Sequence, residues 1–275
     1  MESGMNRKKV ALLGAGNVGY HFFHTLKDKV NFVQVFSRNP ENALELCRFV
    51  KGCRVLHSID KIDRNIDVVI IAVKDDAISQ VAEKLASVTD KKFRPLIFHT
   101  SGTTFVNAGV SYLPTKMGVL YPLQTFTKNI PLDLSKVHFF VAGSGDKHIN
   151  SLKEFALLVS ENVHLIRHED LPALHLAAVF SCNFANHVWS IADRILHGIN
   201  LDFSIMENIV KTTFDKAISV GPHDGQTGPA RRVDHSTISR HASMLDGLDA
   251  KIYDILTSSI INEYHPSNDD LFQNE

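Results

Sequence analysis

The sequence predicts an α/β protein: a doubly wound, mainly parallel sheet in residues 1–168, followed by an all-helical domain in residues 169–275. Two observations support this prediction. Short apolar runs alternate with helix-like stretches through the first part, which is typical of a parallel sheet with helices on both faces. From Leu171 onward the strand-like runs disappear, and a period of 3.6 residues replaces them. In such a sheet, ligands bind beyond the carboxyl ends of the strands.

The composition is that of a globular protein that acts on small molecules. The chain has 275 residues, 44% of them hydrophobic, and its 29 basic and 30 acidic residues give a formal net charge of −1. The charges are dispersed, so the sequence lacks the basic patch of a nucleic-acid-binding or membrane-surface protein. No apolar run approaches the ~20 residues needed to span a bilayer. We therefore expect neither nucleic acid nor membrane as a partner.

The cysteines and the N-terminal segment indicate a cytoplasmic protein. Cys47, Cys53 and Cys182 are odd in number and lack metal-ligand or redox spacing, so reduced thiols are expected. Basic residues 7–9 precede only a short apolar run, which continues into a glycine motif. That segment is therefore expected to be a first strand rather than a signal peptide.

The glycine motif is Gly14-x-Gly16-x-x-Gly19, directly after the apolar residues 10–13 and before a predicted helix at residues 20–29. In a Rossmann unit, the first glycine allows the tight turn, and the second lets the backbone approach a pyrophosphate. The third lets the helix pack closely. The N–H groups at the start of the helix can then hold the diphosphate. We expect cofactor contacts from Gly14, Ala15, Gly16, Asn17, Val18 and Gly19.

The end of the second predicted strand, residues 31–36, favours NADP over NAD. An NAD enzyme would carry an acidic residue there to bind the ribose, but this chain has Ser37-Arg38-Asn39 before Pro40. Ser37 and Asn39 can hydrogen-bond a 2′-phosphate, and the Arg38 guanidinium can pair with it. The alternative is a simple turn with an exposed arginine before a helix that begins near Pro40.

Further strands are expected at residues 54–57, 67–73, 95–99, 119–121 and 137–142, with helices at residues 77–86 and 150–160. Asp75 and Asp76 lie at a predicted helix N-terminus, where the helix dipole explains both carboxylates, so no metal site is predicted. Residues at two strand ends are expected to contact the cofactor: Ala72, Val73, Lys74, Thr100 and Ser101.

The second domain is predicted to contain three long helices. Pro172 suits the first turn of a helix that reaches about residue 197, and a second helix is expected at residues 201–220. Residues 221–232 are rich in Gly and Pro and predict a loop. Asp234 and Ser236 could cap a last helix that reaches about residue 263.

Three ordered motifs resemble a known family. They are His99-Thr-Ser-Gly102, Tyr121-Pro-Leu-Gln-Thr-Phe126, and Gly228-Pro-Ala-Arg-Arg-Val-Asp234 with His241 in the next predicted helix. This set resembles the bacterial Rossmann-like oxidoreductases with a C-terminal domain of unknown function 2520. They belong to the superfamily of pyrroline-5-carboxylate reductases, ketopantoate reductases and β-hydroxyacid dehydrogenases. The resemblance implies NADP-dependent chemistry, a second domain of the 6-phosphogluconate-dehydrogenase C-terminal type, and a homodimer.

One departure from the better-known relatives concerns the proton donor. Ketopantoate reductases and β-hydroxyacid dehydrogenases carry a catalytic lysine four residues before an asparagine. Asn183 matches that asparagine, but Val179 occupies the lysine position. His175 lies eight residues before Asn183, and on an α-helix the two residues could face one cleft about 12 Å apart. His175 is therefore the candidate acid, and His99 is the second candidate because it ends a predicted strand.

Other polar residues are candidates for substrate binding. Ser101 with Gly102 could bind the substrate or only form a turn, and Gln124 could orient a carboxylate. Asn183 could contact a substrate oxygen or another helix. Arg231 could clamp a carboxylate, with Asp234 positioning it, although an intersubunit salt bridge or a helix cap would use the same residues.

Three functions remain open at this point. The first is an NADPH-dependent reductase of a small 2-oxo acid resembling ketopantoate, with hydride transfer followed or accompanied by protonation. The second is a cyclic-imine reductase resembling pyrroline-5-carboxylate reductase, in which a protonated substrate nitrogen makes the missing lysine less important. The third is a non-catalytic NADPH-binding regulator.

Overall fold

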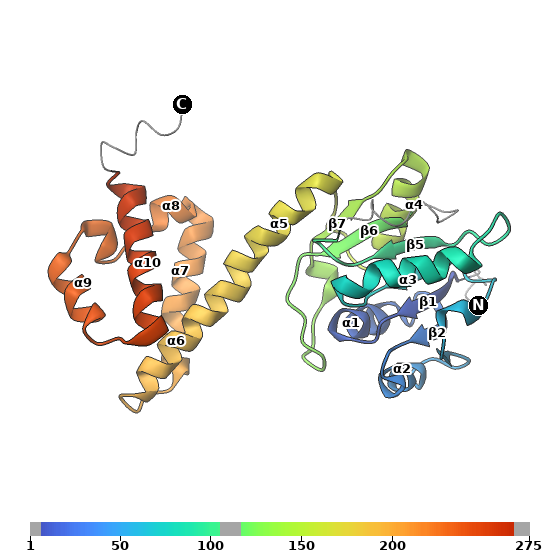
Figure 1. The fold of residues 1–275 in the computed structure, drawn as a ribbon, viewed down its shortest axis with the longest axis horizontal. Helices are drawn as coiled ribbons and strands as arrows, with labels where there is room; N and C mark the ends of the chain where they lie inside the picture. The colour runs from blue at the N-terminus through green and yellow to red at the C-terminus, as the bar shows by residue number, and fades with distance from the viewer. Residues whose placement is uncertain (1–6, 105–116, 267–275) are drawn as a thin grey trace, which may run out of the picture. The chain divides into compact units, whose positions relative to one another are not determined.

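The computed structural model describes residues 7–104 and 117–266. The chain forms two compact units, residues 1–183 and 184–275, and Figure 1 shows the elements of each. The first unit extends past residue 168, where the sequence predicts the domain boundary. It therefore includes the first turns of the long helical segment that begins at Leu171.

The first unit contains a mainly parallel sheet, as the sequence predicts. Its strand order is β3-β2-β1-β4-β5-β6-β7-β8, and among these described strands only the β6–β7 pair is antiparallel. This order is typical of a Rossmann fold, because the chain runs outward from β1 in both directions. The strands are β1 (Lys9–Leu13), β2 (Asn31–Phe36), β3 (Arg54–Leu56), β4 (Val68–Ile71), β5 (Leu96–His99), β6 (Met117–Pro122), β7 (Phe139–Ala142) and β8 (Val163–Leu165).

The sequence did not predict the edge strand β8. It has three residues, two of them exposed, so it lacks the apolar run that identifies the buried strands. Its pairing with β7 places it in the sheet. Tertiary pairing rather than local sequence therefore defines this strand.

Helices cover both faces of the sheet. Residues of α1 (Asn17–Leu26), α2 (Pro40–Cys47) and α4 (Asp146–Ala156) pack in one core cluster, and α3 (Asp75–Val88) packs in the cluster on the opposite face. Along β1 and β4 the side chains alternate between the two clusters, as the pleat requires. Helices α1 and α3 begin earlier than predicted, at Asn17 and Asp75, because the turns that precede them lead directly into helical backbone.

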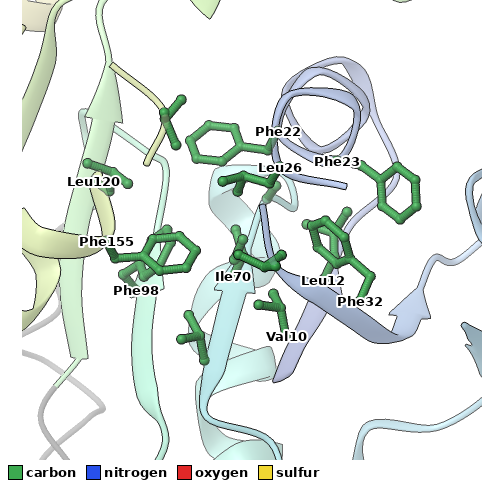
Figure 2. Close-up of a cluster of buried hydrophobic side chains, with 14 of the residues drawn as sticks. Val10, Leu12, Phe22, Phe23, Leu26, Phe32, Ile70, Phe98, Leu120 and Phe155 are labelled. Carbon is green, nitrogen blue, oxygen red and sulfur yellow. The ribbon is translucent and has the colours of Figure 1, made fainter. Parts of the chain in front are cut away.

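The core around α1 combines several phenylalanine rings with aliphatic side chains (Figure 2). Phe22, Phe23 and Leu26 come from α1 and are fully buried. The Phe23 ring stacks on Phe32 of β2, with centroids 4.5 Å apart, and Phe22 meets Phe139 edge-on at 5.8 Å. These contacts hold the helix that follows the glycine motif against the sheet.

The long helical segment is interrupted, which differs from the prediction of one helix up to residue 197. α5 (Leu171–Ala178) is followed by a π-helical stretch (Val179–Phe184) and then by α6 (Ala185–His197). A π-helix has more residues per turn than an α-helix. The α-helical spacing assumed between His175 and Asn183 is therefore wrong.

The rest of the second unit is helical, with two corrections to its predicted boundaries. The predicted loop at residues 221–232 contains α8 (Pro222–Gly225) and a 3-10 turn (Ala230–Arg232). The predicted last helix is two helices, α9 (His235–Ala242) and α10 (Gly247–Tyr264), because Gly247 adopts a φ of +56° at the break. The remaining long helix is α7 (Glu207–Val220). Among the described residues, no helix is long and apolar enough to cross a membrane.

All three cysteines are free, and two of them are neighbours. The Cys47 and Cys53 thiols lie 2.9 Å apart and share a hydrogen bond. This contact, together with burial, raises the pKa of Cys53, whereas the hydrogen bond from Cys53 lowers the pKa of Cys47. Their separation of six residues in sequence did not indicate this proximity.

Candidate functional site

A cavity of about 810 Å³ lies at the carboxyl ends of the central strands. Its size falls within the usual range for sites that bind small molecules and cofactors. The walls come from the segments that follow β1, β2, β4 and β5, together with the starts of α1 and α2 and one face of α3. The lining residues are Gly14, Ala15, Gly16, Asn17, Val18, Phe36, Ser37, Arg38, Asn39, Asn42, Ile59, Ala72, Val73, Lys74, Ala77, Gln80, Val81, Lys84 and Thr100.

The three motif glycines occupy three different environments. Gly14 has a φ of +114°, and a Cβ there would lie 2.2 Å from the Ala72 carbonyl oxygen. A Cβ on Gly19 would lie 1.9 Å from the Gly14 carbonyl oxygen. A Cβ on Gly16 would meet no protein atom within 4 Å, so it would occupy only open space at the cavity wall. The first and third glycines are thus required by the protein's own packing, whereas the second keeps space for a ligand.

The N-terminus of α1 is suited to an anion. Its N-cap is Gly16, which makes no side-chain capping hydrogen bond, and its first turn contains no acidic residue. The backbone N–H groups of such a turn are available to a ligand, and the helix dipole favours negative charge. The Asn17 side chain holds the loop after β6 in place, because Nδ2 donates to the Phe126 carbonyl and Oδ1 accepts from the Lys128 N–H.

The turn after β2 contributes a cation and an oriented amide. Arg38 is exposed, and no ion pair within the described chain involves it. Asn39 is the N-cap of α2, and its Oδ1 accepts a hydrogen bond from the Glu41 N–H at 3.1 Å. With Oδ1 used in this way, the Nδ2 donor of Asn39 is the group left for an acceptor such as a phosphate oxygen.

The cavity is cationic. Arg38, Lys74 and Lys84 all line it, and no aspartate or glutamate is among the described residues that line it. Lys84 belongs to an α3 face, with Ala77, Gln80 and Val81, that the sequence analysis did not assign to the site. These residues lie three or four positions apart on a helix that follows a central strand, and this spacing could have indicated that they share one face. Phe36, Asn42 and Ile59 also line the cavity and were not predicted.

His99 is buried inside the protein at the end of β5. Its Nδ1 accepts a hydrogen bond from the Ser101 N–H at 3.2 Å, and its Nε2 is buried without a hydrogen-bond partner among the described atoms. Burial lowers the pKa of His99 to about 4, with a smaller effect from His168 and an opposing one from Asp75. The imidazole is therefore neutral at pH 7 and holds the Ser101 turn, which suits positioning better than proton donation.

The turn after β5 is tied to α3. The Ser101 hydroxyl accepts hydrogen bonds from the N–H groups of Thr103 and Thr104, at 3.2 and 3.1 Å. The Thr103 hydroxyl donates to Asp75 Oδ2 at 2.6 Å. Thr100 lines the cavity, whereas Ser101 and Gly102 are buried next to it in the chain.

His175 contacts the next strand, β6. Its Nδ1 lies 3.1 Å from the Tyr121 hydroxyl, and the two rings meet edge-on with centroids 5.9 Å apart. Gln124, beyond the end of β6, is exposed, and its Oε1 accepts from the Thr125 N–H. Asn183 lies in the π-helical stretch and is exposed.

The two remaining predicted residues belong to the second unit. The Arg231 guanidinium lies over the Tyr264 ring, 4.1 Å from its centroid. Asp234 is the N-cap of α9 and accepts hydrogen bonds from the Thr237 N–H and hydroxyl and from the Ser236 hydroxyl. These bonds lower the pKa of Asp234 to about 2. The described contacts of Asp234 are those of a helix cap.

Two family models match the chain. The model of the domain of unknown function 2520 (DUF2520) matches residues 137–260, and the shikimate / quinate 5-dehydrogenase model matches residues 1–99. No curated protein sequence matches the chain.

Solved structures with the same fold cover nearly the whole chain. A Bacteroides fragilis protein named as a putative NADP oxidoreductase is 31% identical, with a TM-score of 0.84 over 94% of this chain and 99% of its own. An imine reductase from Myxococcus stipitatus, solved with NADP⁺, is 11% identical, with a TM-score of 0.64 and 92% coverage of each chain. A pyrroline carboxylate reductase from Plasmodium falciparum, solved with NADP, is 12% identical, with a TM-score of 0.59 over 95% of this chain and 100% of its own. The last two likenesses concern the fold alone.

The fold and the glycine-lined cavity together define a Rossmann-type dinucleotide-binding protein with a helical C-terminal part. The chain belongs to the family of Rossmann-like oxidoreductases that carry the DUF2520 domain. The resemblance found in the sequence motifs is thereby confirmed.

Proposed function

We propose that this protein binds NADPH in the cavity of the first unit and uses it to reduce a small 2-oxo acid resembling ketopantoate. The main support for this proposal is the set of residues that line this one cavity. The cavity combines the glycine turn, the Ser37-Arg38-Asn39 segment and two lysines, and the part of its lining that the structure describes contains no carboxylate. Two phosphate-bearing segments of a ligand would find donors and positive charge in the same space.

Different groups of cavity residues would bind different parts of the proposed cofactor. The start of α1 and the glycine turn would hold the pyrophosphate. Ser37, Arg38 and Asn39 would hold the adenosine ribose and its 2′-phosphate, with Lys84 on α3 adding charge. Ala72, Val73, Lys74 and Thr100 line the cavity at the ends of β4 and β5 and would contact the remainder of the cofactor. When bound, the reduced nicotinamide supplies the hydride.

Reduction of a carbonyl places negative charge on its oxygen, so the chain must provide a proton there. We assign His175 as the source of this proton, because it is half-buried and lies beside the strand ends. His99, neutral and bonded to Ser101, would position the turn that carries Ser101 and Gly102 toward substrate. Gln124 and Asn183 remain proposed contacts for substrate oxygens.

The proposed substrate-binding residues of the second unit are Arg231 and Asp234. A guanidinium can bind a carboxylate in bidentate fashion, which suits a 2-oxo acid. Asp234 fixes the start of α9, three residues after Arg231, and would therefore order the backbone around that arginine.

A cyclic imine is the second candidate substrate. Val179 stands where the lysine donor of the ketopantoate reductases is expected, and a cyclic imine whose nitrogen arrives protonated has less need of such a donor. The imine reductase and pyrroline carboxylate reductase named above share the fold of this chain. A non-catalytic NADPH-binding regulator is the third reading, supported by the same missing lysine.

The testing experiment follows NADPH absorbance while the purified protein is offered 2-oxo acids, ketopantoate first, and then cyclic imines, with NADH in parallel. NADPH affinity is measured separately by fluorescence titration. Steady oxidation with a 2-oxo acid supports the proposal, whereas oxidation with imines alone selects the second candidate. Tight NADPH binding without any turnover selects the regulator, and absence of NADPH binding overturns all three.

We also propose that the protein is a cytoplasmic homodimer. Large apolar side chains of the second unit are exposed in the single chain, including Ile209, Phe214 and Ile218 on α7. α7 buries none of its residues. A second copy would bring the same apolar faces and cover them symmetrically. Sedimentation at several concentrations tests this, and a monomer at every concentration would overturn it. The free cysteines support the cytoplasmic location.

A further inference from the structure

Tyr121 is a buried phenol at the reactive edge of the sheet that no assigned role uses. In the parallel pairing of β5 with β6, His99 lies opposite Val119, so Tyr121 is two residues nearer the carboxyl edge. Its side chain is only 8% exposed, and its ring fills the space beside Gly102, where a Cβ would come within 2.8 Å of the ring. Gly102 therefore keeps the predicted substrate turn in direct contact with this ring.

The hydroxyl of Tyr121 is held by α5. Leu171 and Leu174 pack in one cluster with Tyr121 and Val119, which docks the first turn of α5 on β6. This contact brings His175 Nδ1 to 3.1 Å from the Tyr121 hydroxyl. A buried tyrosine hydroxyl usually has a hydrogen-bond partner, and here the partner is a titratable side chain that is itself only half-buried.

The strand order places this pair next to the cofactor cavity. The cavity follows the strand ends from β2 through β1 and β4 to β5, where Thr100 is its lining residue. β6 is the next strand, and Tyr121 stands near its end. A substrate beside the β5 end of the cavity would therefore meet the Tyr121 side of the sheet before it reached His175.

We propose that the Tyr121 hydroxyl is the group that protonates the substrate, and that His175 restores the proton to Tyr121. This inference rests on the proposed reductase function and deepens it. In this proposal His175 returns a proton to Tyr121 and does not donate directly to the substrate.

In each turnover a proton passes from Tyr121 to the substrate and is replaced from His175. With its proton on Nδ1, His175 donates a hydrogen bond to the Tyr121 oxygen and leaves the phenolic O–H free to point at the substrate. That O–H bond breaks as the substrate oxygen, or the nitrogen of an imine that arrives unprotonated, gains the proton while its carbon gains the hydride. As the Nδ1–H proton moves to the tyrosine oxygen, Nε2 takes a proton from water, which leaves a neutral imidazole with its proton on Nε2. Exchange with water then returns a proton to Nδ1 and removes the one on Nε2, so the ring regains its starting tautomer. In each turnover one hydride comes from the reduced cofactor and one proton comes from solvent.

The surrounding charges keep Tyr121 protonated at rest. Burial raises the pKa of Tyr121, and the negative charge of Asp75 on α3 raises it further. Among the described residues, His175 on α5 contacts the Tyr121 hydroxyl, and the charge of Asp75 on α3 acts on it. A donor that stays protonated through neutral and mildly alkaline pH can serve the reaction across that range.

The central test compares Tyr121→Phe with Tyr253→Phe. The first variant keeps the ring that packs on Gly102 and removes only the hydroxyl. The second is a matched control, because the Tyr253 hydroxyl lies 3.2 Å from His241 Nδ1 in the second unit, in an equally edge-on pair. We expect kcat to fall about 10²- to 10⁴-fold in Tyr121→Phe, with NADPH affinity unchanged, and no change in Tyr253→Phe. Equal kcat values for Tyr121→Phe and wild type would overturn the relay and leave the reductase function intact.

The pH profile of the wild type separates the two possible donors. A tyrosine donor predicts a kcat that holds from pH 7 to about pH 9, whereas an imidazolium donor predicts a kcat that falls by about tenfold per pH unit once the imidazole has lost its proton. The second profile would return the donor role to His175. Wild-type protein that binds NADPH and turns over no substrate would instead overturn the proposed function, and the relay with it.

A substrate-free readout examines the hydrogen bond itself. The ¹⁵N chemical shifts of the His175 ring report which nitrogen carries the proton. With NADP⁺ bound, we expect Nδ1 to be protonated in wild type and its shift to change in Tyr121→Phe but not in Tyr253→Phe. A His175 signal that is identical in all three proteins would overturn the contact on which the relay depends.

Discussion

The two units of this chain differ in where they keep their apolar side chains. The sheet of the first unit has a buried cluster on each face, and many of its members are fully inaccessible. In the second unit, the described residues that are buried are only Ile191, Leu196, Ala230 and Thr257. Its large apolar residues are mostly exposed, such as Ile218 at 73% and Leu248 at 72%.

This difference separates two ways of stabilising a fold. The first unit removes its apolar surface from water within one chain, so its stability and its cofactor cavity depend on its own sequence. The second unit forms hydrogen-bonded helices but leaves their apolar faces uncovered, and helices of this length gain most of their stability from packing.

The largest effect is expected from Phe22→Ala. Phe22 is fully buried between α1 and Phe139, so the substitution should cost about 3–5 kcal/mol of unfolding free energy in the first unit. Urea unfolding followed by far-UV circular dichroism measures this cost. The matched variant Phe214→Ala, 65% exposed on α7, should cost little in dilute solution.

The single tryptophan, Trp189, lies in α6 and makes the second unit separately visible by fluorescence. Phe214→Ala should shift the fluorescence transition only at concentrations where chains associate. A loss of several kcal/mol in dilute Phe214→Ala would contradict the contrast between the units.

Acid should weaken the first unit through His99. Its pKa in the folded protein is about 4, below the ordinary histidine value of about 6.5, so the unfolded chain binds the proton more readily. The contribution of neutral His99 to the free energy of unfolding is therefore fully present above about pH 6.5. It is lost as the pH falls toward 4, by about 3 kcal/mol in total. His99→Asn retains an acceptor for the Ser101 N–H and should abolish this slope between pH 7 and pH 5 in urea unfolding. An unchanged slope in that variant would assign it to other groups.

Cofactor discrimination should depend on the cation at the end of β2. Removing a charged hydrogen-bond donor costs about 1.5–3 kcal/mol, so Arg38→Ala should reduce the preference for NADPH over NADH about 10- to 100-fold. Fluorescence titration with both cofactors measures the ratio. Arg48→Ala is the control, because Arg48 is exposed at the other end of α2 and does not line the cavity. Equal ratios for the two variants would remove Arg38 from the site.

The smallest effect is expected from Asp234→Ala. Hydrogen bonds from Thr237 and Ser236 lower the pKa of Asp234 to about 2, so the cap stabilises α9 above the ordinary aspartate pKa of about 4 and fades as the pH falls through 2. The variant should melt below wild type at pH 7, and the difference should shrink as the pH falls from 4 to 2. A difference as large at pH 2 as at pH 7 would mean that Asp234 acts by something other than its charge.

Several features could be predicted from the sequence because local physics determines them. Gly14 adopts a φ of +114°, and a Cβ on Gly19 would collide with the Gly14 carbonyl five residues earlier, so local backbone geometry requires both glycines and the motif can be recognised from the sequence. The buried parallel strands are continuous apolar runs, and Asp234 could be recognised as a cap from its position before a helix. The position of Ser37, Arg38 and Asn39 at the cavity could be predicted because one βαβ unit sets their distance from the glycines.

Other features were decided only by the tertiary structure. Lys84 and Gln80 reach the cavity because α3 presents one face to it, and β8 exists through its pairing with β7. The contact of Tyr121 with His175 joins a strand to a helix that begins some fifty residues later, and it depends on the packing of Leu171. The loss of charge on His99 follows from complete burial. These properties depend on distances between segments remote in sequence and on the exclusion of water, and neither is encoded in a local pattern.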